Sequence, residues 1–189
     1  MKIYTRKGDD GTTGLLYGGR VPKDSPAITV NGAVDEAQAA LGMARALASG
    51  EGADPGAELD MLLVRLEREL YVLMAEVATA LPNRSKLEPG RTLVTAEMVS
   101  ALENDIDRLT GRFAMPTEFV VPGGTPTAAA LDVARTVVRR AERLMLGLEL
   151  PADSLVGPYL NRLSDLVWTM ARWQDGGSIS SRTGKAVGS

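Results

Sequence analysis

Apolar residues recur at intervals of three and four along residues 57–80. This spacing matches the 3.6-residue turn of an α-helix and places the apolar side chains on one face. A helix of this length with one apolar face is stable only when other elements cover that face, which restricts the chain to a packed helical architecture. The row consists of Leu59, Leu62, Leu63, Leu66, Leu70, Leu73, Met74 and Val77.

Four further segments carry the same periodicity, so the sequence predicts an all-α five-helix bundle. Thr95 is expected as the N-cap of the third helix, although Met98 stands where a capping box would have glutamate. The four further helices are expected at residues 32–48, 95–110, 125–148 or 127–148, and 153–174 or 157–174.

Glycine and proline predict loops between these helices, at residues 49–56, 82–91 and 112–126. Strand patterns are scarce, and residues 2–5 and 27–30 are the only short candidates. The 189 residues suit one domain, which we place at residues 1–174 with an N-terminal loop over residues 1–24. Residues 175–189 are small and polar, and we expect them to form a disordered tail.

The composition excludes several classes of site. The chain has no cysteine and no histidine, which removes disulfides, thiolate metal sites and an imidazole base. We expect any metal to be a hard ion held by oxygen, such as Mg²⁺. The net charge of −3 gives no reason to expect nucleic-acid binding, and the sequence predicts no signal peptide or membrane span. The default prediction is a cytoplasmic enzyme or binding protein.

The segment GDDGTTGLLYGGR, from Gly8 to Arg20, is unusually rich in glycine. Ordering such a loop costs conformational entropy. A bound anion would offset this cost by accepting hydrogen bonds from backbone N–H groups. A mobile leader without a ligand is the alternative interpretation. The polar side chains that would serve an anion or its magnesium ion are Lys7, Asp9, Asp10, Thr12, Thr13 and Lys23.

Arginines recur every four residues in the fourth predicted helix, at Arg135, Arg139 and Arg143, with Arg140 beside them. Like charges at this spacing repel one another, and nearby carboxylates at positions 132 and 142 balance only part of the charge. One interpretation is a solvated face with local ion pairs. The other is a polyphosphate site, since guanidinium groups bind phosphate oxygens bidentately.

Three further features have both a structural and a functional interpretation. Asp35 and Glu36 are expected in the first turn of a helix, where the helix dipole favours acids. Phe119 lies in a loop and would serve either as an anchor or as part of a site. In the fifth helix, Asn161 and Asp165 share a face, which suits a buried polar network or a ligand contact.

Together these segments resemble the PduO-type ATP:cob(I)alamin adenosyltransferases from about Lys2 to Arg172. The resemblance is carried by IYTRKGDDGTTGL with GGRVPKD, by GAVDE, by FVVPGGT with VARTVVRRAER, and by LNRLSDL, in that order. It implies a bundle of the ferritin-like, cobalamin adenosyltransferase-like type that forms a homotrimer with active sites between subunits. It also implies transfer of the 5′-deoxyadenosyl group of ATP to cob(I)alamin, giving adenosylcobalamin and triphosphate.

The resemblance assigns roles to individual residues. Asp35 would pair across the subunit interface with Arg135, and Phe119 would close the lower face of the corrin, so these three belong to the cobalamin site. With Arg139 they form the implied catalytic set. The implied ATP-binding residues are Thr5, Arg6, Lys7, Gly8, Thr13, Gly14, Lys23, Arg139, Arg140, Glu142, Arg143 and Asn161.

The resemblance also implies ligands and partners. ATP and cob(I)alamin, formed from cob(II)alamin, would be the substrates, with Mg²⁺ as cofactor and no metal held by a protein cluster. A flavin-type reductase and a cobalamin-dependent mutase are the expected partners. The sequence departs from the family pattern at Ala37, Gln38 and Glu76, and Lys86 is the only lysine in the 82–91 loop.

Three other interpretations stay open on sequence alone. A non-catalytic carrier or chaperone would hold ATP and cobalamin for a mutase. A phosphotransferase on a helical scaffold would release ADP, or AMP with pyrophosphate, instead of triphosphate. A structural bundle would use its arginines only for ion pairs and would not be stabilised by ATP.

Overall fold

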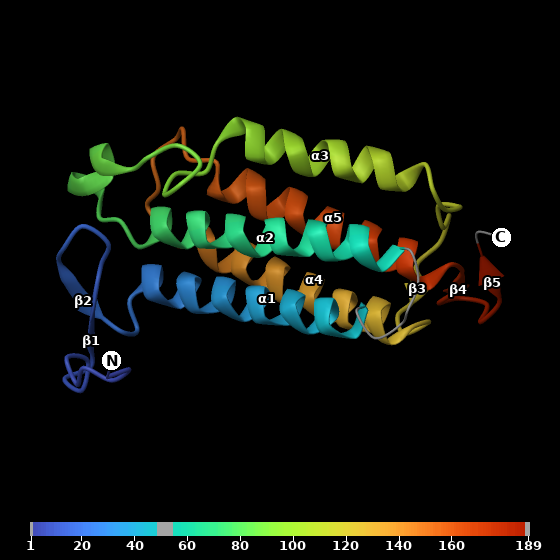
Figure 1. Cartoon of the computed structure of the whole chain (residues 1–189), viewed down its shortest axis with the longest axis horizontal. Coiled ribbons are helices and arrows are strands. Elements are labelled where there is room, and N and C mark those ends of the chain that lie inside the picture. Colours follow the sequence, from blue (N-terminus) through green and yellow to red (C-terminus); the bar gives the residue numbers. More distant parts are fainter. Residues whose placement is uncertain (1, 49–54, 188–189) are drawn as a thin grey trace.

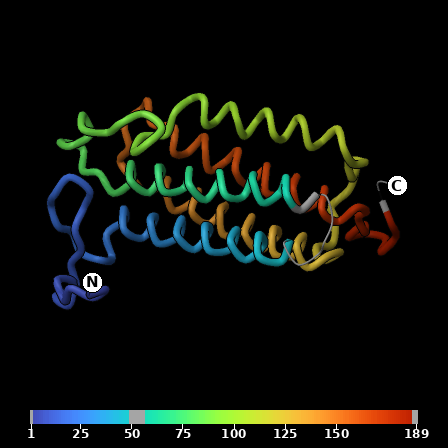
Figure 2. Tube along the Cα trace, in the orientation of Figure 1, coloured from blue at the N-terminus to red at the C-terminus, as the bar shows by residue number. Residues whose placement is uncertain are grey.

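The structure, a computed structural model, describes residues 2–48 and 55–187 (Figure 2). The described residues form five α-helices, which confirms the predicted five-helix bundle. A short 3₁₀ helix, η1 (Leu81–Lys86), follows the second of them. The α-helices are α1 (Pro26–Ala48), α2 (Pro55–Val77), α3 (Ala96–Thr110), α4 (Pro126–Met145) and α5 (Val156–Asp175).

The helices lie side by side along one long axis (Figure 1). Helix α1 packs against α2 and α4, while α5 packs against α4 and α3. The apolar row predicted for α2 lies in the shared core, where Leu63, Leu66 and Leu70 are fully buried. Alanines such as Ala37 of α1 and Ala134 of α4 are also fully buried, and such small side chains let helices approach closely. Burial of each leucine contributes about 2 kcal/mol.

Helix α1 begins at Pro26 rather than at residue 32, so residues 27–30 are helical and the short strand considered there is wrong. Proline at the first helical position is preorganised for a helix, and burial of Val30 outweighs the weak helix propensity of this β-branched stretch. Asp35 and Glu36 consequently lie well inside the helix. The helix dipole acts only in the terminal turns, so our dipole interpretation of these acids is wrong.

The other helix boundaries agree more closely with the expectations. Thr95 is the N-cap of α3, as predicted, and its hydroxyl accepts from the Met98 N–H. Helices α2 and α4 end at Val77 and Met145, three residues before the predicted ends at 80 and 148. The first six residues of the loop expected at 49–56 lie outside the described residues.

Two small antiparallel sheets lie at opposite ends of the bundle (Figure 1). Near the N-terminus, β1 (Thr12–Gly14) pairs with β2 (Arg20–Pro22). At the other end, β4 (Ser178–Ser180) pairs with β3 (Val120–Val121) and with β5 (Ala186–Val187). Residues 2–5 form no strand.

The C-terminal sheet differs from the disordered tail expected after residue 174. Helix α5 includes Asp175, and Ser178 and Ser180 are buried where β4 pairs with β3. Backbone hydrogen bonding holds this segment in place, and a stretch of small polar residues gives no sequence signal for it. Residues 188–189 of the tail lie outside the described residues.

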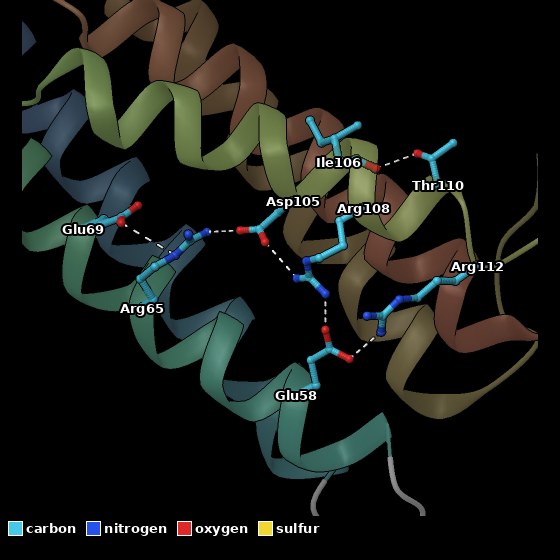
Figure 3. A network of polar contacts seen from close by, with 8 residues as sticks. All are labelled: Glu58, Arg65, Glu69, Asp105, Ile106, Arg108, Thr110 and Arg112. Carbon is cyan, nitrogen blue, oxygen red and sulfur yellow. Dashed lines mark hydrogen bonds and ion pairs between the residues drawn. The ribbon is translucent and has the colours of Figure 1, made fainter.

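Ion pairs connect α2 to α3 along one side of the bundle (Figure 3). Asp105 of α3 is the centre of this network, because it accepts hydrogen bonds from Arg65 of α2 at 2.6 Å and from Arg108 at 2.8 Å. Arg108 and Arg112 also donate to Glu58, near the start of α2. Asp105 is only 9% exposed, so water screens these interactions less than on an open surface.

We predict that Asp105→Asn lowers the free energy of unfolding by about 2 kcal/mol, because an amide removes the largely buried charge that Arg65 and Arg108 share. For a chain of this size, the melting temperature should fall by about 4–8 °C, measured by circular dichroism at fixed protein concentration. Asp107→Asn, on the exposed side of the same helix, is the control and should shift stability by less than about 0.5 kcal/mol. Equal melting temperatures for the two variants would contradict a role for the network.

Candidate functional site

The glycine-rich segment before α1 is folded around Thr12. Asp10 Oδ1 accepts from the backbone N–H of Thr12 at 2.9 Å and from its hydroxyl at 2.8 Å. Arg20 Nε in turn donates to the Thr12 hydroxyl at 2.9 Å. The backbone N–H of Thr12 and then its hydroxyl hold the pKa of Asp10 below its usual value, and Arg20 adds to the effect. The part of the loop around Thr12 is therefore held by the loop's own side chains.

Cationic groups surround this loop. A Cβ placed at Gly8 would lie 3.1 Å from Lys23 Nζ and 3.2 Å from the Thr12 carbonyl oxygen, so glycine lets the lysine lie across the loop. Arg6 has a φ of 59°, a left-handed conformation that costs about 1 kcal/mol for a non-glycine residue. Exposed Lys7 is adjacent to it. Cations beside a strained, glycine-rich backbone are typical of an anion-binding loop.

All ATP-site residues predicted before α1 belong to this loop or border it. They are Thr5, Arg6, Lys7, Gly8, Thr13, Gly14 and Lys23. Among the hydrogen bonds and ion pairs of the described residues, none joins these seven to the arginines of α4. Within the described residues, the two halves of the predicted ATP site are therefore not joined by a hydrogen bond or an ion pair.

A cleft of about 760 Å³ lies where α4, α5 and the β3 segment meet. Phe119 borders it and is 87% exposed, which is unusual for one of only two phenylalanines in the chain. Arg135 and Arg139 of α4 lie on the same cleft, so the structure brings these three predicted residues together. The remaining lining residues are Pro116, Thr117, Glu118, Val120, Pro122, Asp132, Ser164, Asp165, Trp168, Arg172 and Arg182.

Carboxylates fix the buried arginine beside this cleft. Arg172 is only 2% exposed, and it pairs with Asp132 of α4 and, at 3.1 Å, with Asp175 of its own helix. Asp132 also lies 3.5 Å from Arg135 Nε and thus connects the buried arginine to an arginine that borders the cleft. Burial raises the pKa of Asp175, and Arg172 opposes this effect. The pairs balance the buried charge and orient Arg135.

A polar row on α4 and α5 continues from the cleft. Asn161 Nδ2 donates to Glu142 Oε1 at 2.8 Å, and Arg162 Nη1 donates to Asn161 Oδ1 at 2.5 Å. Partial burial raises the pKa of Asp165, which faces Arg162 and Arg139 as well as Glu142. Asn161 therefore belongs to a polar network with Glu142 and Arg162, while Asp165 borders the cleft and its contact with a ligand stays a prediction.

The remaining α4 arginines have different surroundings. Arg140 pairs with Glu36 of α1, so this acid has an ion-pair partner on the surface of the bundle. Within residues 2–48 and 55–187, neither Arg139 nor Arg143 has an ion-pair partner. Two exposed guanidinium groups on the same helix thus remain available for an anion.

No ion pair joins Asp35 to Arg135 among the described residues. Asp35 borders a different pocket, of about 380 Å³, between α1 and α2. The two departures beside it have structural explanations: Ala37 is fully buried in the core, and Gln38 donates to the Glu67 carbonyl oxygen at 2.9 Å. The implied Asp35–Arg135 pair is therefore not formed among the described residues and stays a prediction.

Sequence reasoning missed several residues of the cleft. Trp168 carried a signal, because it is one of two tryptophans and follows the polar motif of the fifth helix. Arg172 gave none, since nothing in a helical pattern shows that an arginine is buried. Arg182 was missed because it lies in the predicted tail. Outside the cleft, Arg20 of the loop was also missed, since no local pattern shows that it binds Thr12.

Comparison with known proteins agrees with this geometry. The family model described as cobalamin adenosyltransferase matches residues 3–174. The corrinoid adenosyltransferase of Bacillus subtilis is 38% identical over 175 residues, covering 91% of this chain and 86% of that protein. The corrinoid adenosyltransferase PduO of Salmonella typhimurium is 36% identical over 177 residues, covering 93% of this chain but 50% of that protein. This chain thus spans half the length of the PduO relative.

A solved structure extends the likeness to three dimensions. A variant of the PduO-type ATP:corrinoid adenosyltransferase from Lactobacillus reuteri, complexed with cobalamin and ATP, has a TM-score of 0.84 and 29% identity. The match covers 98% of this chain and 100% of that one. The family match extends from the glycine-rich loop to the end of α5, and on this basis the chain belongs to the cobalamin adenosyltransferase family.

Proposed function

We propose that this chain transfers the 5′-deoxyadenosyl group of ATP to cob(I)alamin, giving adenosylcobalamin and triphosphate. The observation that carries the proposal is the cleft that an exposed Phe119 lines together with Arg135 and Arg139. An apolar ring and two cations in one cleft suit a large, flat ligand with polar edges, such as a corrin. The Lactobacillus reuteri relative, whose structure holds cobalamin and ATP, supports this assignment.

The proposed reaction balances without a protein base. The cobalt(I) electron pair forms a bond to C5′ of ATP, the C5′–O bond breaks, and triphosphate leaves with its electron pair. No proton is transferred, so a chain without histidine is sufficient. The protein's task is to align the two substrates and to stabilise the charge on the leaving triphosphate.

We assign these two tasks to two groups of residues. Phe119 would cover the lower face of the corrin and keep water and other axial ligands from cobalt. Arg139 and Arg143, which have no ion-pair partner among the described residues, would bind triphosphate together with Lys7 and Lys23 of the loop. Guanidinium groups bind phosphate oxygens bidentately, so these arginines would also orient the leaving group.

The separation of the loop residues and Asp35 from the α4 arginines favours a homotrimer with active sites between subunits. Among the described residues, no hydrogen bond or ion pair joins the loop to the α4 arginines, and Asp35 and Arg135 border different pockets. A neighbouring subunit would bring its own loop and Asp35 to this cleft. Exposed apolar residues on α1, including Met43 at 51% exposed, are consistent with a covered face in the assembly.

Mg²⁺ would accompany ATP and support the charge of the triphosphate. The described residues hold no group of three or more carboxylates that would cage a metal, and Asp10 already binds Thr12 and Arg20. Most ligands of the ion would therefore be phosphate oxygens and water, with Asp9 as the nearest free carboxylate of the loop.

The proposal extends to partners and location. Cob(II)alamin must gain one electron before the transfer, which a flavin-type reductase would supply, and a cobalamin-dependent mutase would take the product. We place the protein in the cytoplasm. Within the described residues, no helix combines the length and the apolar character needed to cross a membrane.

An anaerobic assay with MgATP and chemically reduced cob(I)alamin tests the function. Adenosylcobalamin in the corrin spectrum together with intact triphosphate would support it. Release of ADP, or of AMP with pyrophosphate, would indicate a phosphotransferase. Without turnover, stabilisation by ATP approaching about 2.7 kcal/mol at one hundred times its Kd would favour the carrier, and no stabilisation would favour a structural bundle.

We predict that Arg139→Ala lowers kcat/KM for ATP by about 10²–10³-fold, because a preorganised cation at the leaving group is lost. The melting temperature should be unchanged, since Arg139 is exposed and has no ion-pair partner among the described residues. Arg91→Ala is the control, because this exposed arginine pairs only with its neighbour Glu88. Unchanged ATP kinetics in Arg139→Ala would contradict the assignment.

We predict that Phe119→Ala slows product formation from cob(II)alamin under a mild reductant by at least about tenfold, or about 1.4 kcal/mol. Loss of the ring admits an axial ligand, and cobalt(I) prefers four ligands, so reduction becomes harder. Reaction from preformed cob(I)alamin should change much less. Phe113→Ala, at the other phenylalanine, should retain the parent rate with cob(II)alamin. A parent-like rate in Phe119→Ala would show that the ring is unimportant.

A further inference from the structure

Glu76 is a buried carboxylate near the end of α2, at the same end of the bundle as the glycine-rich loop (Figure 1). Glu76 is 0% exposed, yet each of its carboxylate oxygens accepts at least one hydrogen bond. Oε1 accepts from Arg84 Nη2 at 2.8 Å and from Ser154 Oγ at 2.7 Å, and Oε2 accepts from the Val94 N–H at 2.9 Å. A charge buried this completely costs several kcal/mol unless such partners surround it.

The three donors come from three different segments of the chain. Arg84 belongs to η1, Val94 precedes α3, and Ser154 precedes α5. The carboxylate therefore holds together the connections at this end of the bundle. The Arg84 side chain is only 19% exposed, so the pair is weakly screened and fixes η1 against the end of α2.

Helix η1 and the segments next to it support the glycine-rich loop at Leu16 and Tyr17. Asn83 Nδ2 donates to the Tyr17 carbonyl oxygen at 3.4 Å, and the Lys86 ammonium lies 6.0 Å from the centre of the Tyr17 ring. The Leu16 N–H donates to the Ala78 carbonyl oxygen at 2.9 Å, directly after α2. These contacts connect the loop to the parts of the chain that Glu76 fixes.

The loop needs this external support because its turn is strained. Tyr17 has a φ of 62°, in the left-handed region that a side chain rarely adopts, and Gly18 and Gly19 also have positive φ. Such a conformation persists only where the surroundings hold it. Movement of η1 would release the turn, and with it the segment of the loop that carries the proposed phosphate-binding residues.

We propose that Glu76 and Arg84 form a positioning pair that holds η1 beneath the glycine-rich loop and thereby sets the affinity for ATP. This inference rests on the proposed function. The pair is largely buried, and it lies at the opposite end of the bundle from β3, which follows Phe119 (Figure 1). It should consequently act on ATP and leave the corrin cleft unaffected.

The experiment measures KM for ATP and for cob(I)alamin in Glu76→Gln and in the parent. We expect KM for ATP to rise about tenfold, which corresponds to about 1.4 kcal/mol of lost loop ordering, while KM for cob(I)alamin stays within about twofold. Glu76→Asp keeps the charge with a shorter reach and should recover part of the ATP affinity. Equal increases in both KM values, or no increase for ATP, would overturn the proposal.

Two further variants separate positioning from stability. Glu69→Gln is the matched control, because Glu69 is a largely buried carboxylate on the same helix that accepts from Tyr159 at 2.7 Å. It should lower the melting temperature without changing KM for ATP. Asn83→Ala removes the loop contact from a partly exposed position, so it tests the proposal even if Glu76→Gln does not fold, and it should raise KM for ATP severalfold.

The outcomes distinguish the two proposals. A parent protein that makes no adenosylcobalamin and does not bind MgATP by calorimetry would overturn the proposed function, and the positioning role with it. A fully active parent with unchanged KM for ATP in Glu76→Gln and Asn83→Ala would overturn the positioning role alone. Selective loss of ATP affinity in these variants, with Glu69→Gln unchanged, would support it.

Discussion

Burial of the central apolar faces is the constraint on which the rest of this structure depends. Leu63 and Leu70 of α2 are fully removed from water, as are Ala37 of α1 and Ala134 of α4. This packing stabilises the middle of the bundle through dispersion and the hydrophobic effect. Most residues of the connections between the helices lie outside this core, and these connections can adopt strained, polar conformations. Both proposed substrate sites use such connections.

Each end of the bundle is organised around a buried charge. At the loop end, Glu76 accepts from three segments. At the cleft end, Arg172 is enclosed by Asp132 and Asp175, and a Cβ at Gly124 would lie only 2.4 Å from Asp175 Oδ1. This close approach explains the glycine before α4 and holds the chain that leads from Phe119 against α5. Buried ion pairs often add little net stability, but they specify which segments must meet.

The arginines of α4 fall into two groups, those that form ion pairs within the chain and those that are available to a ligand. Arg140 is paired with Glu36, and Arg135 is oriented by Asp132, whereas Arg139 and Arg143 have no ion-pair partner within the described residues. A helix with unbalanced arginines gains stability when an anion arrives. The glycine-rich loop carries cations as well, so both halves of the proposed ATP site would attract the same polyphosphate. In the proposed assembly, the bound polyphosphate would bring two subunits together.

Sequence alone determined the helices and the family, because both depend on local patterns. The 3.6-residue periodicity of α2, the cap at Thr95 and the arginine spacing on α4 are visible in one dimension. Tertiary structure alone decided which residues meet. It placed Asp35 and Glu36 inside α1, because burial of Val30 extended that helix, and it ordered residues 178–180 through backbone pairing with the Phe119 segment. It also assigned Arg172 and Glu76 their partners, since the burial of a charge is set by packing between distant segments and leaves no periodic signal.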